Sequence, residues 1–200
     1  MAKGSSFERL ICKALSGWWS GGKRDDIFWR ASNSGGRATV RMRRGKATYG
    51  QHGDVAATDP VGDPLLKLCA IEIKRGYSRR TFADMLDQPA HAKKHEWEAF
   101  VHQAQRSASA MGSMGWLLIT RRDKRECLVF MPTDLFNGMR RCFGFRRPVP
   151  FVQMRVNGKG GTDELNVCGT TLTAFCSTIT PGMVLAFVEP NVRKSRMLHT

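Results

Sequence analysis

One stretch decides the fold, and it reads Cys69-Ala70-Ile71-Glu72-Ile73-Lys74. It belongs to a strand predicted over residues 66–75, and successive side chains of a strand point to opposite faces. We therefore expect the cysteine and the two isoleucines on one face, toward a core, with Glu72 and Lys74 together on the other. The stretch predicts a carboxylate and an ammonium group side by side.

A second acid, Asp54, follows Gly53 in a shorter predicted strand over residues 53–57. The turn signal Asp59-Pro60-Val61-Gly62-Asp63-Pro64 separates the two strands, so we expect a hairpin with a long tip. Hairpin pairing would bring Asp54 next to Glu72. Two carboxylates this close repel each other unless a cation lies between them, and oxygen ligands of this kind suit Mg²⁺ or Mn²⁺.

Phosphodiester hydrolysis uses such a group of residues. A metal ion activates water and neutralises the charge that grows on the phosphate, and a nearby basic group orients or deprotonates that water. Lys74 is placed for the second task. The alternative is that Glu72 and Lys74 form an ordinary ion pair on a solvated strand, which is the more frequent outcome for an isolated E-x-K triplet.

The rest of the first two thirds alternates between helix and strand patterns. The order, which is helix, three strands, helix and two strands, predicts an α/β fold with a mixed sheet flanked by helices. The predicted helices cover residues 6–19, 81–86 and 97–111, and the other strands cover residues 26–31, 116–121 and 126–131, with a polar loop at 32–36.

The last third is less regular. We expect an α/β core over residues 1–132 and an α+β extension over residues 133–200 that packs on the core and has no assigned role. The predicted features of the extension are a strand at 152–156, a glycine-rich turn at 158–161, a short apolar segment at 172–179 and a strand at 183–188.

The charge of the chain is unusual. It has 32 Lys and Arg residues against 17 Asp and Glu, which gives a formal net charge of +15 and a pI near 10.2. Such a balance is typical of proteins that bind polyanions. No stretch approaches the roughly 20 apolar residues of a membrane-spanning helix. Nucleic acid is therefore the expected partner, and a basic protein without such a partner is the alternative.

Two basic clusters are candidates for contact with DNA. The second cluster interleaves with Phe143 and Phe145, whose rings could stack on bases or wedge between them. Either cluster could instead be a solvated basic face. The first consists of Arg37, Arg41, Arg43, Arg44 and Lys46, and the second of Arg140, Arg141, Arg146 and Arg147.

The cysteines and the N-terminal sequence indicate a reducing compartment. The six cysteines lie far apart without a C-x-x-C pair, so we interpret them as buried thiols rather than as zinc ligands. The first residues lack the apolar core of a signal peptide and pass directly into a helix pattern. A cytoplasmic location is expected.

The order of elements and the motifs around Asp54 and Glu72 resemble the core of the PD-(D/E)XK nuclease superfamily. Asp54 would correspond to the first Asp of the motif, and Glu72-Ile73-Lys74 to its (D/E)XK. The 17 residues between Asp54 and Glu72 fit the variable hairpin of that core, while Gly53 stands where the motif has a proline. The resemblance covers roughly residues 4–131.

The resemblance implies DNA cleavage with Mg²⁺ or Mn²⁺. The metal ligands would be Asp54, Glu72, the main-chain carbonyl of Ile73 and a further acid, Glu8, and Lys74 would be catalytic. Glu8 could instead close a capping box that begins at Ser5. Nucleases of this kind often place a glutamine on the long helix, where Gln103 is the candidate and a solvated helix face is the alternative.

Within the superfamily, two features resemble Holliday junction resolvases and related phage endonucleases. They are Gly4-Ser5-Ser6-Phe7-Glu8 at the start of a helix and the polar loop after the first strand. This resemblance implies a homodimer acting on duplex or branched DNA. Restriction-type and repair-type nucleases remain alternatives within the superfamily. A non-enzymatic nucleic-acid-binding protein is the alternative from another class, and it would be indifferent to Mg²⁺.

Overall fold

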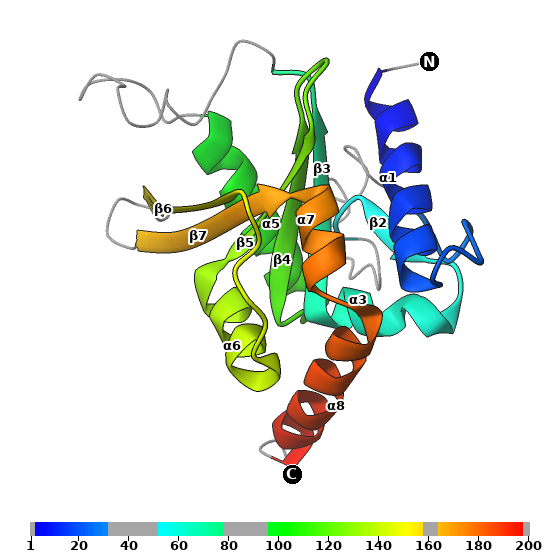
Figure 1. The fold of residues 1–200 in the computed structure, drawn as a ribbon, viewed down its shortest axis with the longest axis vertical. Coiled ribbons are helices and arrows are strands. Elements are labelled where there is room, and N and C mark those ends of the chain that lie inside the picture. The colour runs from blue at the N-terminus through cyan, green and yellow to red at the C-terminus, as the bar shows by residue number, and fades with distance from the viewer. Residues whose placement is uncertain (1–2, 32–51, 78–95, 158–163, 198–200) are drawn as a thin grey trace, which may run out of the picture.

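The computed structural model describes residues 3–31, 52–77, 96–157 and 164–197 (Figure 1). The polar loop predicted at 32–36, the helix predicted at 81–86, the glycine-rich turn at 158–161 and the first basic cluster lie outside these residues.

A five-stranded mixed sheet forms the centre of the molecule, in the order β3-β4-β5-β7-β6. β3 and β4 are parallel, with Glu72 opposite Leu118, and the other neighbours are antiparallel. The parallel pair needs a crossover, which the helix α5 provides. The strands are β3 Cys69–Arg75, β4 Gly115–Arg121, β5 Cys127–Pro132, β6 Phe151–Asn157 and β7 Glu164–Thr171.

The first helix, α1 Lys3–Trp19, packs on a small second sheet and on the core. Phe7, Ile11 and Leu15 recur every four residues and are buried along one stripe of the helix. Ser16 Oγ accepts a 2.9 Å hydrogen bond from the Phe28 main chain, which ties the helix to β1 Phe28–Arg30. β1 pairs in antiparallel fashion with β2 Val55–Ala57.

The prediction that a hairpin connects the strands of Asp54 and Glu72 is wrong. β2 pairs with β1, and the chain reaches β3 through the 3₁₀ helix η1 Pro60–Gly62 and the helix α3 Asp63–Leu68. The prolines that indicated a hairpin tip begin these helices instead, since proline favours the first helical turn. The Asp59 side chain caps η1 by accepting a 3.0 Å hydrogen bond from Val61 N. Residues 66–68, predicted as strand, are therefore helical.

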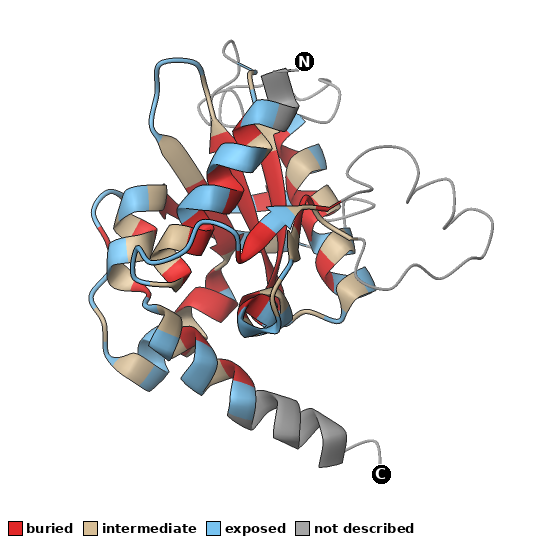
Figure 2. Ribbon diagram, turned by 90° about the vertical axis from the view of Figure 1, so that its right-hand side faces the viewer, coloured by how far each residue is buried: buried red, intermediate tan, exposed pale blue. Residues whose placement is uncertain are grey.

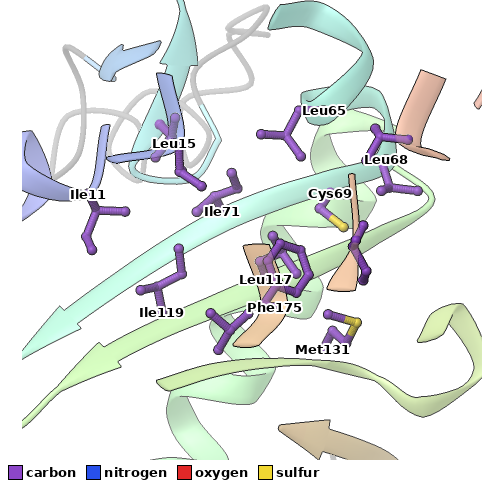
Figure 3. Close-up of a cluster of buried hydrophobic side chains, with 14 of the residues drawn as sticks. Ile11, Leu15, Leu65, Leu68, Cys69, Ile71, Leu117, Ile119, Met131 and Phe175 are labelled. Carbon is purple, nitrogen blue, oxygen red and sulfur yellow. The ribbon is translucent and has the colours of Figure 1, made fainter. Parts of the chain in front are cut away.

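Helices cover both faces of β3, which is buried along most of its length (Figure 2). Cys69, Ile71 and Ile73 join the core cluster under α1, as the alternating pattern predicted. Figure 3 shows Ile71 beside Ile11 and Leu15 of α1. The opposite face packs against α5 Glu96–Met111, which confirms the predicted long helix. Glu72 and Lys74 point to this second face.

The last third of the described chain extends the same sheet. β7 pairs with β5 and β6 pairs with β7. Of the three helices in this region, two pack on these strands, and the last packs on α3 and on the first of the three. The strand predicted at 183–188 is wrong, because these residues lie in α8. Thr180 Oγ1 accepts a hydrogen bond from Met183 N at the start of α8, and Val184 and Val188 are buried one turn apart. The three helices are α6 Thr133–Phe143, α7 Leu172–Thr178 and α8 Pro181–Met197.

The architecture is a mixed α/β fold with a five-stranded sheet flanked by helices, which confirms the predicted restriction-endonuclease-like class. Among the helices of the described residues, none is by itself long and apolar enough to cross a membrane. Only Leu172–Thr178 together with Pro181–Glu189, bent by 66°, meets the requirement of length and composition as a pair.

Candidate active site

Hydrogen bonds to the backbone of β3 hold Asp54 against this edge strand of the five-stranded sheet. Its N–H donates a 2.7 Å hydrogen bond to the carbonyl of Ile71, and its carboxylate oxygen Oδ2 accepts a 2.7 Å bond from the N–H of Ile73. Gly53 makes this approach possible. Its φ is +89°, and a Cβ there would lie 2.9 Å from the Ile71 oxygen. The glycine that replaces the proline of the motif therefore has a steric reason in this chain.

Glu72 is almost completely buried, with 2% of its surface exposed. Three side chains donate hydrogen bonds to its carboxylate. Gln103 Nε2 lies 2.8 Å and Lys74 Nζ 3.0 Å from Oε2, and Ser107 Oγ lies 2.7 Å from Oε1. A buried carboxylate needs such donors, because burial without them carries a large desolvation penalty. The structure thus brings Gln103 to the site and adds Ser107.

Lys74 lies between the two carboxylates. Its Nζ is 3.0 Å from Glu72 Oε2 and 3.8 Å from Asp54 Oδ2, and its side chain is only 16% exposed. The ammonium also lies 6.0 Å from the centre of the Phe100 ring. When both acids are ionised, Asp54, Glu72 and Lys74 carry two negative charges and one positive charge in a buried place, so the group is then short of positive charge.

The protonation of Asp54 reflects this shortage. Burial, followed by the neighbouring Glu72 charge, raises the pKa of Asp54 to about 7. The nearby ammonium of Lys74 and the hydrogen bond from Ile73 N–H act in the opposite direction but do not outweigh the burial. A divalent cation next to Asp54 would favour its charged form.

Glu8 approaches the site from α1, but its carboxylate is paired with a base. Arg30 Nε of β1 donates a hydrogen bond to Glu8 Oε2, and both side chains are largely buried. The Glu8 charge also contributes to raising the pKa of Asp54. Because α1 begins at Lys3, Ser5 lies inside the helix, whereas the capping-box alternative places it at the helix start.

Two residues of this neighbourhood were missed in the sequence. Ser107 lies four residues after Gln103 on α5, and residues at that spacing share a helix face, so the spacing was the available signal. Arg30 gave no comparable signal, because its partner Glu8 lies 22 residues away on another element.

The donor set fits Mg²⁺ or Mn²⁺. No three His, Cys, Asp or Glu side chains of the described residues form a cluster that could hold a metal ion by themselves. Mg²⁺ does not require one, because it usually binds through one or two carboxylates and keeps waters or phosphate oxygens as its other ligands. Asp54 and Glu72 supply those carboxylates, and the missing positive charge is what a cation would add.

The cysteines are all free thiols. Cys12, Cys69 and Cys168 are buried as predicted, and burial raises the pKa of the Cys12 thiol to about 12. Cys127 and Cys176 are only partly buried, and Cys142 near the end of α6 is exposed, which corrects the prediction that all six would be buried.

The second basic cluster surrounds the end of α6, and the two aromatic residues of this stretch are partly buried. Phe143 packs against Phe187, with ring centres 6.4 Å apart, and Phe145 packs against Phe136 at 5.5 Å. Both rings pack against the core and stay partly exposed. The four arginines of the cluster are exposed.

The chain matches a family model described as "phage putative PDDEXK endonuclease", over residues 1–186. No curated protein and no solved structure matches it. The match extends past residue 131, where the resemblance noted in the sequence ended, and includes the strands β6 and β7.

Proposed function

The chain belongs to the family of phage PD-(D/E)XK endonucleases, and on that premise we propose that it hydrolyses DNA phosphodiester bonds with Mg²⁺ or Mn²⁺. The observation that carries the proposal is the pair of buried carboxylates, Asp54 and Glu72, that share the single ammonium of Lys74. The alternative for an E-x-K triplet is an ordinary solvated ion pair. Here Glu72 is instead buried and held by Gln103 and Ser107, and a second acid, Asp54, shares its lysine.

We assign the cation to Asp54, Glu72 and the carbonyl of Ile73. The N–H of Ile73 already points to Asp54, and the carbonyl of a strand residue points to the same side as its N–H. Glu8 would join as a further acid. When bound, the cation would activate water and neutralise charge on the phosphate.

The side chains of the chain itself have separate roles in this proposal. Lys74 orients the attacking water and offsets the negative charge of the transition state. Gln103 and Ser107 hold the Glu72 carboxylate in one orientation, and Gln103 also helps to position water or phosphate. Such groups act best when they are already in place before the substrate arrives.

The test is cleavage of duplex DNA with and without Mg²⁺, by the wild type and by Asp54→Asn. We expect the wild type to bind DNA without metal and to cut only with it, and Asp54→Asn to bind but not to cut. Mg²⁺-dependent cutting by the variant would contradict the site. Binding that falls with salt, with no cutting under any metal condition, would favour the non-enzymatic alternative.

The finer proposal is a structure-specific enzyme, a Holliday junction resolvase that works as a homodimer. Its support is the resemblance at the start of α1 and the position of Glu8 close to the Asp54 charge. A panel of linear, single-stranded, flapped and four-way junction DNA ranks the substrates directly. Sedimentation of the protein with and without junction DNA then measures the number of subunits. Equal cutting of all duplex substrates would remove the resolvase proposal and leave the nuclease proposal in place.

A further inference from the structure

A hollow of about 820 Å³ opens at the C-terminal end of α6. We call it the α6 hollow. The turn after the helix forms one side of it, and Figure 1 shows α6 at the opposite end of the molecule from the tip of β3. Its polar lining consists of Asn137, Arg140, Arg141, Arg146 and Arg147.

The charge of the α6 hollow is not balanced by acids. None of its four arginines forms an ion pair within the described part of the chain, and Arg147 instead lies over the ring of Phe151, 5.3 Å from its centre. Four guanidinium groups around one hollow repel each other, and an anionic ligand would remove that repulsion. Arginine in particular suits phosphate, because its planar group donates several hydrogen bonds at once.

The backbone and the aromatic residues hold the α6 hollow in shape. Gly144 ends α6 with a φ of +67°, and its N–H donates a 2.9 Å hydrogen bond to the Arg140 carbonyl. Behind the arginines, the Phe136 ring packs against Phe145 at 5.5 Å and against Phe151 at 5.0 Å. The turn is therefore anchored in the core, so a ligand would not have to order it first.

The α6 hollow is separate from the candidate active site. Asp54 and Glu72 lie at β3, one edge of the five-stranded sheet, whereas Arg147 contacts Phe151 on β6, the other edge. The two edges are four strand spacings apart, or about 19 Å. α6 also joins the core cluster on the face of the sheet opposite to α5. DNA that contacts both sites would extend beyond the scissile bond by about six base pairs.

We propose that the α6 hollow is a second DNA-binding site, which holds backbone phosphates of the substrate away from the bond that is cut. This inference rests on the proposed nuclease function for its choice of DNA as the ligand. Phosphate contacts of this kind position a substrate without reading its sequence.

The test is metal-free binding of a duplex of about 30 base pairs, which is long enough to reach both sites, at several salt concentrations. Arg140→Gln/Arg146→Gln removes two charges and keeps the ring contact of Arg147. Its matched control is Lys23→Gln/Lys67→Gln, which removes two exposed charges elsewhere. We expect the arginine variant to bind about tenfold more weakly, with a salt dependence smaller by about two ions, and the control to bind like the wild type.

Two further measurements keep the test decisive. DNA should protect the arginines of the α6 hollow in the wild-type protein from modification by phenylglyoxal, which needs no variant that has to fold. Equal DNA affinity of the two double variants, or an absence of protection, would overturn the proposal. A variant that loses binding to polyglutamate but keeps binding to DNA would also overturn it, in favour of an acidic protein partner. Wild-type cleavage is measured in parallel, so a protein that binds through the hollow but never cuts would contradict only the nuclease function.

Discussion

The hydroxyl of Ser107 donates a 2.7 Å hydrogen bond to Oε1 of Glu72, which links the long helix α5 directly to the edge strand β3. The other carboxylate oxygen is shared by Gln103 and Lys74. Ser107 is therefore the donor that fixes the rotation of the Glu72 carboxylate.

Ser107→Ala should lower stability and cleavage together. The change leaves Oε1 of a buried carboxylate without this donor, which costs about 1–3 kcal/mol of unfolding free energy. Urea unfolding and cleavage at saturating DNA measure the two effects. Ser109→Ala is the matched control on the same helix, because the Ser109 hydroxyl is exposed and bonds only to the Gln105 carbonyl. Similar effects of both variants would contradict a positioning role for Ser107.

Gly53→Ala should displace Asp54 from the edge of β3. Alanine at this position is destabilising for two reasons. The left-handed backbone is strained for alanine, and its Cβ would lie 2.9 Å from the Ile71 oxygen. Gly22→Ala isolates the first cost, since its φ is +85° but no atom lies within 4 Å of its added Cβ. We expect about 1–2 kcal/mol of destabilisation for Gly22→Ala and a larger loss for Gly53→Ala. Only Gly53→Ala should reduce cleavage. If Gly53→Ala and Gly22→Ala lost equal unfolding free energy, the close approach of residue 53 to the Ile71 oxygen would not be rigid.

Asp54→Asn should stabilise the metal-free protein, and by more at higher pH. The pKa of Asp54 is raised to about 7 in the folded protein, above its ordinary value near 4, so the folded state binds this proton more tightly than the unfolded state. The contribution of Asp54 to stability is therefore complete below about pH 4 and is lost as the pH rises through about 7. Asparagine does not titrate, so its advantage should grow across that window, as measured by thermal melting in EDTA.

Asp26→Asn provides a control of the opposite sign. The hydrogen bond from Arg24 lowers the pKa of Asp26, so its contribution is present at neutral pH and is lost as the pH falls through the lowered value. This variant should be less stable than the wild type at pH 7, with a difference that disappears in acid. Added Mg²⁺ should cancel the stability advantage of Asp54→Asn but should not change the effect of Asp26→Asn. An advantage that does not change with pH would show that Asp54 is not held protonated by its surroundings.

Lys74→Ala should cost turnover far more than binding. Its ammonium lies within 3.0–3.8 Å of both acids, where it can act on the charge of the transition state. By analogy with other preorganised electrostatic groups, we expect cleavage to fall on the order of a hundredfold or more at nearly constant DNA affinity. Lys67→Ala removes one exposed charge of the same kind on α3 and should cut normally. If Lys74→Ala cut DNA at the wild-type rate, the result would instead support the alternative that Glu72 and Lys74 form an ordinary ion pair.

The sequence predicted the centre of the fold better than its connections. The alternation of residues 69–75 is a local property, and it placed Cys69, Ile71 and Ile73 correctly in one core cluster. The prediction of a hairpin failed because proline is typical both of turns and of helix starts. In the structure, the cap formed by Asp59 shows that a helix begins there. The strand predicted at 183–188 failed because its branched and aromatic residues suit a strand, whereas the cap at Thr180 and burial at Val184 and Val188 select a helix.

The candidate site shows the same division. Asp54, Glu72 and Lys74 belong to short motifs, so their proximity could be predicted from two strands. Ser107 and Arg30 meet their partners through packing between separate elements, 35 and 22 residues away along the chain. The four-residue spacing places Ser107 beside Gln103 on one face of α5, but no local pattern identifies Glu72 or Glu8 as a partner. The number of possible partners for one serine or arginine is too large for the sequence alone.

The attachment of Asp54 to β3 also bears on aggregation. β3 lies at the edge of the five-stranded sheet, and an unpaired strand edge is a template on which a second chain can add. The main chain and carboxylate of Asp54 occupy the Ile71 carbonyl and the Ile73 N–H that such a chain would use. The segment that carries Asp54 thus covers part of this edge, so the contacts that position Asp54 also oppose the addition of a second chain.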